Sequence, residues 1–389
     1  MYKCSVIGLS DSHRQWLPPM VMRLIASGHI FSGGRRHHEI VASLLPPDAV
    51  WIDITVPINR ILKQYEKFNN IVIFASGDPL FYGFANTIKR VFPNIELKVY
   101  PAFNSLQMLA HRLNMAYHDM CAVSLTGRSW DRFDEALIKG ERLIGCLTDK
   151  KKTPHEIWKR MCDFGYDNYQ MYVGESLGNE EAEHIGIYDS SKEYNVPNCV
   201  ILEQKFLRRQ HTGIEDNEFF LLDGRSKMIT KMPIRLASIA ALNLADKQSL
   251  WDVGFCTGSV SVEAKIAYPH LHVTAFEIRT ECKELMMKNA RKFHTPGIKA
   301  IIGDFCVVDT SQLVAPDAIF LGGYGGKMKE LLLKAKRLLA PSGCIVFNSV
   351  SETSKCNFIT ITEELGLKAE AVHTITVDNN NPITILRAK

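Results

Sequence analysis

The chain has 389 residues, of which 46% are hydrophobic and 23% charged, and its formal net charge is +4. This length exceeds that of one ordinary domain, so two domains are expected. No apolar run reaches the roughly 18 residues that span a bilayer, and the first ten residues lack a signal-peptide pattern. These features exclude a membrane partner. The mild charge argues against nucleic acid and suits a small anionic substrate.

The ten cysteines are scattered along the chain without a C-x-x-C pair. This spacing argues against a disulfide framework and against a structural zinc site. It favours reduced thiols in a cytoplasmic protein, with no metal.

The first half of the chain alternates short apolar, β-branched runs with helical stretches. Strands are expected at residues 3–9, 49–54, 70–76, 95–100 and 142–147. Such alternation predicts an α/β layer built from β-α units. We therefore expect an N-terminal α/β domain over residues 1–204.

After this domain, charge becomes dense and periodicity is lost, which suits a linker at 205–225. The α/β pattern then restarts in a second domain, residues 226–389. Helices are expected at 232–245, 259–268 and 281–293, and strands at 249–254, 272–278, 298–303, 317–323, 343–350, 370–377 and 382–388. This order predicts a second, doubly wound sheet.

The segment "DVGFCTGS" is typical of a strand that runs through a glycine-cornered turn into a helix. Glycines at both corners let the backbone turn tightly and approach a ligand closely. The predicted cofactor turn consists of Gly254, Phe255, Cys256, Thr257 and Gly258. Glu277 ends the next strand, where its carboxylate can accept bonds from both ribose hydroxyls. The plain alternative is an ordinary β-α-β crossing with an exposed glutamate.

The same residues bear on the choice between NAD and S-adenosylmethionine. The dinucleotide fingerprint has a third glycine early in the helix, where this chain has Ser261. The segment "IIGDF" ends the third strand, where Asp304 and the backbone of Phe305 can meet an adenine. Acidic residues after two strands, without a pyrophosphate seat, favour S-adenosylmethionine.

Five C-terminal segments resemble the C15-methylating, decarboxylating half of the precorrin-6Y methyltransferase family of cobalamin biosynthesis. They are "MITKMPIRLASIAAL", "WDVGFCTGSVSVEA", "FEIRTE", "IIGDF" and "FLGGYGGKMKELL". The resemblance implies that a glycine loop lines the tetrapyrrole pocket, carried by Gly322, Gly323, Tyr324, Gly325 and Gly326. It also implies a cofactor contact from Thr230. Cys256 departs from the family's glycine, and we expect it to fit if its backbone keeps a negative φ.

N-terminal segments are similar to the C5-methylating half of the same family, which has the two-lobed tetrapyrrole methylase fold. They are "SGGRRHHEIV", "ASGDPLFYGFA", "SLTGR" and "GESLGNEEAEHIG". The resemblance implies that Gly77, Asp78 and Pro79 hold S-adenosylmethionine, together with Ser105 after the next strand. The early segment "VIGLSDS" departs from the family's glycine-rich pattern, so Ser10 and Asp11 are not expected to bind a ligand.

The implied reaction is methylation of a precorrin at C5 and C15, with loss of the ring-C acetate as carbon dioxide. The many carboxylates of a precorrin need guanidinium and ammonium groups as binding partners. The candidates for this binding are Arg35, Arg36, Arg128, Lys231 and Arg235. For each of them, the alternative interpretation is a charged side chain on the surface, exposed to solvent. No catalytic residue is assigned.

Four histidines, His37, His38, His270 and His272, lack the spacing of a metal site and are expected to be structural or solvent-facing. The resemblance also implies a homo-oligomer. Two alternatives remain open. The C-terminal half can be a methyltransferase of RNA or protein, although a broad basic surface is then expected. Otherwise, one half can be a non-catalytic module that binds S-adenosylmethionine and regulates the other.

Overall fold

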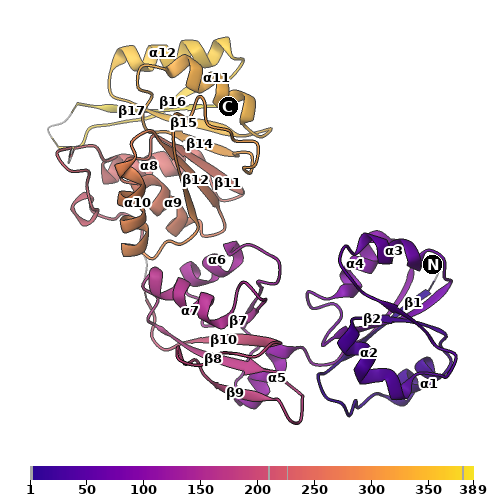
Figure 1. The fold of residues 1–389 in the computed structure, drawn as a ribbon. Coiled ribbons are helices and arrows are strands. Elements are labelled where there is room, and N and C mark those ends of the chain that lie inside the picture. The colour runs from indigo at the N-terminus through magenta and orange to yellow at the C-terminus, as the bar shows by residue number, and fades with distance from the viewer. Residues whose placement is uncertain (1–2, 209–210, 226, 379–380) are drawn as a thin grey trace. The chain divides into compact units, whose positions relative to one another are not determined.

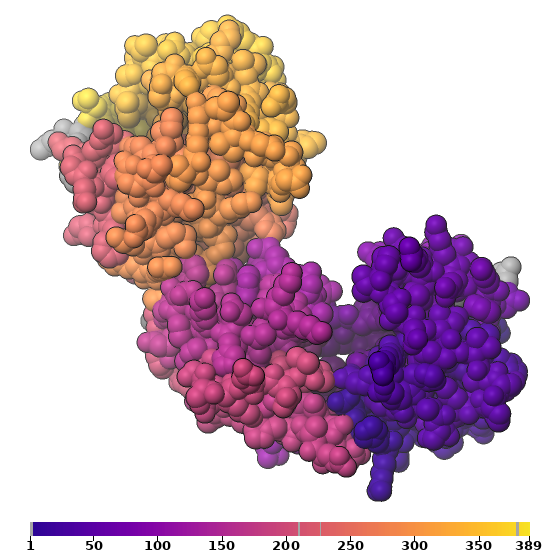
Figure 2. Space-filling view, in the orientation of Figure 1, coloured from indigo at the N-terminus to yellow at the C-terminus, as the bar shows by residue number. Residues whose placement is uncertain are grey.

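The computed structural model describes residues 3–208, 211–225, 227–378 and 381–389 (Figure 1, and Figure 2 as a space-filling view). By their contacts the residues form two compact units. The first unit comprises residues 1–128, 142–158 and 169–205, and the second comprises 129–141, 159–168 and 206–389. Across the described residues, no helix is long and apolar enough to cross a membrane. Residues 209 and 210 of the predicted linker lie outside the described residues.

The first sheet has five parallel strands in the order β3-β2-β4-β1-β5. They are β1 (Lys3–Leu9), β2 (Ile30–Gly33), β3 (Val50–Asp53), β4 (Asn70–Ser76) and β5 (Glu96–Tyr100). The helices of this region are α1 (Pro19–Ala26), α2 (Arg35–Val41), α3 (Asn59–Tyr65) and α4 (Phe84–Val91), with a 3-10 turn η1 (Ala42–Leu44). Four of the five strands match the sequence prediction, and β2 is additional.

Both faces of the first sheet are covered. Val6 and Ile73 belong to the core on one face, whereas Ile7 and Phe74 belong to the core on the other. Successive strand residues point to opposite faces, so a strand that is buried on both faces must be apolar throughout. This requirement explains why the interiors of β4 and, apart from Ser5, of β1 are apolar.

The second sheet has the order β6-β7-β10-β8-β9, in which only β6 and β7 pair in parallel. Its strands are β6 (Cys121–Ser124), β7 (Leu143–Leu147), β8 (Tyr169–Glu175), β9 (His184–Ile187) and β10 (Asn198–Gln204). The helices of this region are α5 (Ser105–Arg112), α6 (Asp131–Lys139) and α7 (Pro154–Asp163). α5 packs Leu106 and Leu109 against Leu143 and Ile201. Two separate sheets before residue 205 correspond to the two lobes of the predicted fold.

The third sheet has the order β13-β12-β11-β14-β15-β17-β16 and is parallel except for β17, which runs antiparallel to both of its neighbours. Its strands are β11 (Ser249–Val253), β12 (His272–Glu277), β13 (Ile298–Ile302), β14 (Ala318–Leu321), β15 (Cys344–Ser349), β16 (Ala369–Ile375) and β17 (Ile383–Ala388). The helices are α8 (Met232–Leu242), α9 (Ser259–Ala267), α10 (Glu281–Lys292), α11 (Met328–Leu338) and α12 (Glu352–Glu364). Figure 1 shows α11 and α12 on one side of this sheet and α8 to α10 on the other. The prediction of a doubly wound sheet is confirmed.

The segment before α8 is packed against the third sheet's helices. Ile214 and Phe219 are buried and share a core with Val262 of α9. A 3-10 turn, η2, covers Asp216–Glu218. The side chain of Ile214 is only 2% exposed, so part of the predicted linker belongs to the folded second unit.

Arg235 of α8 holds Ile214, Asp216 and Thr230 in place through buried contacts. It is fully buried, pairs with the carboxylate of Glu263, and donates to Asp216 at 3.1 Å and to the carbonyl oxygen of Thr230 at 2.6 Å. Glu263 also accepts the backbone N–H of Ile214 at 3.1 Å. A buried charge needs such partners, and removing one of them is strongly destabilising. Arg235 is therefore a structural residue, which corrects its prediction as a partner for substrate carboxylates.

Candidate functional site

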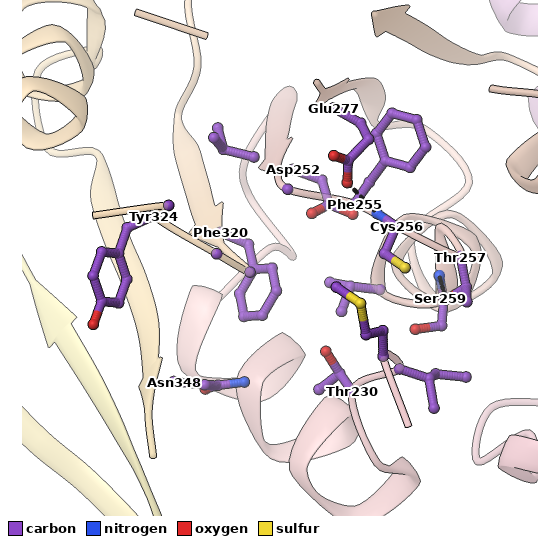
Figure 3. Close-up of a pocket in the computed structure, with 18 of the residues that line it drawn as sticks. Thr230, Asp252, Phe255, Cys256, Thr257, Ser259, Glu277, Phe320, Tyr324 and Asn348 are labelled. Carbon is purple, nitrogen blue, oxygen red and sulfur yellow. Dashed lines mark hydrogen bonds between the residues drawn. The ribbon is translucent and has the colours of Figure 1, made fainter. Parts of the chain in front are cut away.

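The strand order of the third sheet reverses at β11, whose neighbours are β12 and β14. Loops that leave the carboxyl ends of strands at such a reversal diverge, and ligands bind in the crevice between them. A cavity of about 930 Å³ lies there, lined largely by residues that follow β11 to β14 (Figure 3). We call it the C-terminal cavity.

The turn after β11 and the loop after β14 meet at glycines. Gly254 has a φ of +84°, and a Cβ atom on it would lie 3.0 Å from the backbone nitrogen of Gly323. A Cβ atom on Gly322 would lie 2.8 Å from the carbonyl oxygen of Gly254. Gly258, with a φ of +74°, begins α9 and leaves room for Met286. Glycine is thus required where these loops approach each other.

Cys256 lies in the middle of the turn with a φ of +47°, in the left-handed region. The condition set by the sequence for an unstrained fit, a negative φ, is therefore not met. A residue with a Cβ atom costs on the order of 1 kcal/mol in this region, so the structure gives a physical reason for the family's glycine. The Cys256 side chain is buried beside Phe255 and Met286, and both Cys256 and Thr257 line the cavity.

Glu277 lies at the end of β12 and is 4% exposed. Its Oε2 accepts the backbone N–H of Cys256 at 3.0 Å and the Nη2 donor of Arg279 at 2.8 Å. Burial acts to raise the pKa of Glu277, but hydrogen bonds from Arg279 and the backbone outweigh it and hold the pKa below its ordinary value. The carboxylate is therefore ionised at neutral pH and is fixed beside the cysteine of the turn.

Asp252, in β11, is a second buried carboxyl group of this cavity. Its Oδ2 accepts the hydroxyl proton of Ser261 at 2.6 Å. Its Oδ1 is buried and has no hydrogen-bond partner among the described residues. Burial raises the pKa of Asp252 to about 7, with a smaller contribution from the charge of Glu277. An unpaired buried acceptor is costly, so this oxygen suits a donor on a bound ligand.

Of the other predicted cofactor residues, Thr230, Asp304 and Phe305 also line the C-terminal cavity, whereas Gly258 is not among its lining residues. Figure 3 shows the hydroxyl of Thr230 directed into it. Asp304 accepts the backbone N–H of Cys306 at 2.9 Å and pairs with Lys327 at 2.8 Å, and the hydrogen bond from Lys327 lowers its pKa. The ring of Phe305 is buried edge-on against Phe276, with centroids 5.0 Å apart. That ring thus belongs to the core as well as to the cavity wall.

The predicted substrate residues Gly322, Gly323, Tyr324 and Lys231 line the same cavity. Lys231 also lies 3.3 Å from a carboxylate oxygen of Asp216. The described lining contains five cations against three carboxylates: Arg225, Lys227, Lys231, Arg279 and Lys327 against Asp252, Glu277 and Asp304. An excess of positive charge favours an anionic ligand.

A second cavity, of about 570 Å³, lies in the first unit near the carboxyl ends of β1 and β4. We call it the N-terminal cavity. Gly77 and Ser105 line it, as the sequence predicts. Gly77 has a φ of +60°, and a Cβ atom there would lie 2.8 Å from the Cα atom of Asn104, the N-cap of α5. The loop after β4 can therefore approach the start of α5 only with glycine at this position.

Four predicted residues are not among those that line the N-terminal cavity: Asp78, Pro79, Arg35 and Arg128. Asp78 accepts the backbone N–H of Leu80 at 2.8 Å and shapes the loop. The Arg35 side chain is 93% exposed and pairs with Glu39 at 3.2 Å. Arg128 lies 5.0 Å above the ring of Tyr82, which does line the cavity.

Sequence reasoning missed several residues of the N-terminal cavity. Ser10, Asp11 and His37 line it together with Arg36 and Ser76. His37 had only the expectation of a structural or solvent-facing role. The available signal is position, because these residues follow or end strands whose carboxyl ends share one edge of the first sheet.

Two residues of the C-terminal cavity were missed in the same way. Asp252 is an acidic residue inside an otherwise apolar strand, which is itself a signal. Asn348, near the end of β15, lines the cavity, and its Oδ1 lies 3.0 Å from the hydroxyl of Ser238 (Figure 3). Its position becomes evident only once the sheet order is known.

The two-lobed α/β region and the doubly wound sheet with its glycine turn define an α/β enzyme of the methyltransferase class. A family described as tetrapyrrole (corrin/porphyrin) methylases matches residues 3–187, and a precorrin methyltransferase domain matches residues 218–388. The chain belongs to the family of the decarboxylating precorrin-6Y C5,15-methyltransferases.

Three relatives illustrate this similarity. The decarboxylating precorrin-6Y C(5,15)-methyltransferase of Sinorhizobium sp is 28% identical over 358 residues, covering 89% of this chain and 84% of that protein. The cobalt-precorrin-7 C(5)-methyltransferase of Salmonella typhimurium is 26% identical over 204 residues, covering 52% and 99%. The decarboxylating cobalt-precorrin-6B C(15)-methyltransferase of the same organism is 34% identical over 134 residues, covering 34% and 68%.

Proposed function

We propose that this protein methylates a precorrin, or its cobalt form, at C5 and C15 and removes the ring-C acetate as carbon dioxide. S-adenosyl-L-methionine is the cofactor. The observation that carries the proposal is the presence of two separate cavities, one in each unit, each beside a glycine with positive φ at the carboxyl end of a strand. Two methyl groups and two unrelated folds are consistent with one methylation per unit.

The residues of the C-terminal cavity fit S-adenosyl-L-methionine. The glycines at 254 and 322 leave a cradle that a Cβ atom would fill. The unpaired Oδ1 of Asp252 suits an ammonium donor. The ionised Glu277 suits ribose hydroxyls once the Arg279 side chain, which contacts both of its oxygens, moves away. When bound, the cofactor supplies an electrophilic methyl group. Thr230 and the 254–258 turn are proposed to hold it, with Asp304 and Phe305 beside the adenine.

The chain's own contribution to methyl transfer is positioning and the exclusion of water. The cationic residues at the C-terminal cavity are proposed to bind the carboxylates of the macrocycle, with Lys231 and the loop at 322–324 nearest to it. Loss of carbon dioxide needs an electron sink, which the macrocycle provides. The protein then has to hold the departing carboxylate in place, away from bulk water.

In the first unit, Gly77 and Ser105 are proposed to hold the second molecule of cofactor, with Asp78 and Pro79 shaping the loop. Arg36 lines this cavity, and it is proposed to bind a substrate carboxylate. Arg35 and Arg128 are proposed to bind substrate carboxylates at the rim of this cavity, where Arg128 lies over the ring of Tyr82.

Mass spectrometry tests the function directly. The protein is incubated with isotope-labelled S-adenosyl-L-methionine and either metal-free precorrin-6Y or its cobalt form. We expect a gain of two methyl groups and the loss of one carbon dioxide with one of these substrates. Recovery of both substrates unchanged would contradict the proposal.

We also propose that the protein works in the cytoplasm as a homo-oligomer, without nucleic acid. All ten cysteines are free thiols, which is consistent with a reducing compartment. Light scattering after size-exclusion chromatography measures the oligomeric state, and a mass near 43.9 kDa would indicate a monomer instead.

A further inference from the structure

Ser76 ends β4, the strand that lies between β2 and β1 in the first sheet. Leu9, the last residue of β1, pairs with it in the ladder. Its exposed side chain lines the N-terminal cavity, and Arg36 and His37 of α2 contact it. The sequence resemblance gives this serine no role.

His37 presents one ring nitrogen to the backbone and the other to Ser76. Its Nδ1 lies 3.2 Å from the backbone nitrogen of Gly34, which is a donor, so Nδ1 must be the acceptor. Burial, assisted by the charge of Arg36, lowers the pKa of His37 to about 4, so the ring is neutral near pH 7. A neutral imidazole that accepts at Nδ1 carries its proton on Nε2. That proton is donated to the Ser76 hydroxyl oxygen, 2.9 Å away.

Arg36 occupies the second acceptor position of the same hydroxyl. Its Nη2 donates to Ser76 Oγ at 3.1 Å, and its Nε lies 3.2 Å from a carboxylate oxygen of Asp11. A serine hydroxyl has two acceptor lone pairs and one proton. Both lone pairs of Ser76 are therefore used, and no described residue accepts its proton. The hydroxyl can act only as a donor toward the cavity.

We propose that Ser76 and Arg36 form a seat for a carboxylate group in the N-terminal cavity, with Ser76 held as a donor by His37. Ser76 contributes its O–H and Arg36 its remaining guanidinium donors. This inference rests on the proposed function, because the carboxylate belongs either to the macrocycle or to the amino-acid end of the cofactor.

The chemistry of the seat selects an anion. A donor-only hydroxyl beside a guanidinium cannot coordinate a cation, but it matches the two oxygens of a carboxylate. Asp11 binds the Nε side of Arg36 and so fixes the direction of its guanidinium. His37 has no direct role with the ligand, and it acts as a positioning residue for the Ser76 proton.

Binding experiments on the full-length protein test the seat without requiring turnover. The probes are uroporphyrin III, a tetrapyrrole with eight carboxylates, and S-adenosylmethionine beside its decarboxylated form. We expect Ser76→Ala to weaken binding of the ligand that carries the seated carboxylate by about tenfold to thirtyfold. Ser76→Thr keeps the hydroxyl and should restore most of the affinity. Ser27→Ala is the matched control, because this exposed serine donates to the carbonyl oxygen of Leu24 outside the cavity.

The outcomes separate the two sources of the carboxylate. A loss confined to uroporphyrin III assigns the seat to the macrocycle. A loss for S-adenosylmethionine that is absent for its decarboxylated form assigns it to the cofactor. Unchanged binding of both probes, or an equal loss for both forms of the cofactor, would overturn the proposal.

His37→Phe provides a second variant, should Ser76→Ala fold poorly. It removes the Nε2 donor and frees one lone pair of Ser76, so the hydroxyl proton can turn away from the ligand. We expect a smaller loss in the same binding assay, and no loss at all would contradict the positioning role. Failure of the proposed function itself would instead appear as absence of methyl transfer by the wild-type protein.

Discussion

Arg279 lies across Glu277 and holds both oxygens of its carboxylate, with Nε 3.0 Å from Oε1 and Nη2 2.8 Å from Oε2. The same carboxylate accepts backbone N–H groups from Cys256, Ile278 and Arg279 itself. Five donors exceed the roughly four acceptor positions of a carboxylate. A ribose diol can therefore bind Glu277 only if the Arg279 side chain is displaced.

If Glu277 binds the ribose as proposed, Arg279 competes with the cofactor for the same carboxylate. We expect Glu277→Gln to bind S-adenosylmethionine at the C-terminal cavity about tenfold to a hundredfold more weakly, because losing charge-assisted hydrogen bonds costs about 1.5–3 kcal/mol. Arg279→Ala should bind it at least as tightly as the wild type. Isothermal titration measures both affinities. Lys288→Ala on α10 controls for the loss of an exposed positive charge. Equal weakening in both cavity variants would show that Arg279 assists binding.

The strained turn at Cys256 gives a second prediction. Its φ of +47° is tolerated by glycine without cost and by alanine only with strain. We expect Cys256→Gly to be more stable than Cys256→Ala by about 1 kcal/mol, since both lack the thiol and only alanine keeps the Cβ atom. Cys256→Val should be the least stable of the three. Urea unfolding measures the series, and an alanine variant as stable as the glycine variant would contradict the strain.

Asp252 links stability to pH. Its pKa rises by burial from an ordinary 3.8 to about 7 in the folded protein, so the folded state binds this proton more tightly than the unfolded chain. The stability contributed by Asp252 is thus complete below about pH 4 and is lost as the pH rises through about 7. The side chain of Asp252→Asn cannot ionise. Between about pH 4 and 7, the free energy of unfolding of the wild type should therefore fall further than that of the variant, by on the order of a few kcal/mol.

Urea unfolding at several pH values between about 4 and 8 tests this dependence. The difference between the two curves isolates Asp252 from the other ionisable groups of the protein. Ser261→Ala keeps the carboxyl group and removes only its hydroxyl partner, so its stability should still fall as the pH rises. Parallel curves for wild type and Asp252→Asn would show that the carboxyl is not buried as described.

The third sheet could be predicted almost strand for strand, because most of its parallel strands are short, largely apolar runs separated by helical patterns. The second sheet could not. β9, for example, has no fully buried residue, so it lacks the pattern that marks a strand. α12 was also missed, since its threonines and isoleucines at 359–362 do not show a clear helical stripe. Burial is not the whole reason, because β10 was missed although four of its residues are buried.

The candidate sites show the same division. Gly254 and Glu277 could be placed at the cavity from sequence because their positions depend on local chain geometry. The contacts of Ser76 could not, since its partners on α2 lie about forty residues earlier. The two-point contact of the Arg279 guanidinium with the Glu277 carboxylate was also missed, although the two residues are only two positions apart in the sequence. Rotamers and ring orientations depend on packing that no sequence pattern records.

The boundary between the two domains is the fourth prediction. Ile214, Asp216 and Phe219 pack against the second unit, and Asp216 is a partner of the buried Arg235. A fragment of residues 206–389 should therefore fold cooperatively and resist urea better than one of residues 222–389, which loses these contacts. Residues 1–204 should remain soluble when expressed alone.

The fragment of residues 206–389 lacks the helical segments 129–141 and 159–168. They belong to the second unit by contact, and Tyr166 donates to the carbonyl oxygen of His294 at 2.7 Å. Circular dichroism and urea unfolding of the three fragments decide the boundary. If residues 206–389 aggregate under conditions in which the full chain is soluble, the two halves do not fold independently.

The last prediction concerns the division of chemistry between the two cavities. Gly77→Val should close the N-terminal cavity, because its Cβ atom would lie 2.8 Å from the Cα atom of Asn104 at a φ of +60°. Gly254→Val should close the C-terminal cavity, where the Cβ atom would lie 3.0 Å from the nitrogen of Gly323. Gly366→Ala controls for positive φ alone, since nothing lies within 4 Å of its added Cβ atom.

If each cavity serves one methylation, the two variants should yield different products from one substrate. The Gly77 variant should still release carbon dioxide and add the C15 methyl group, but it should lack the C5 methyl group. The Gly254 variant should lose decarboxylation together with the C15 methyl group. The rates of both steps should fall about a hundredfold or more, which corresponds to a loss of at least about 2.7 kcal/mol of transition-state stabilisation. Isotope-traced mass spectrometry and trapping of labelled carbon dioxide measure the two losses separately. Release of carbon dioxide by the Gly254 variant at the wild-type rate would overturn the assignment, because the C-terminal cavity would then have no part in the decarboxylation.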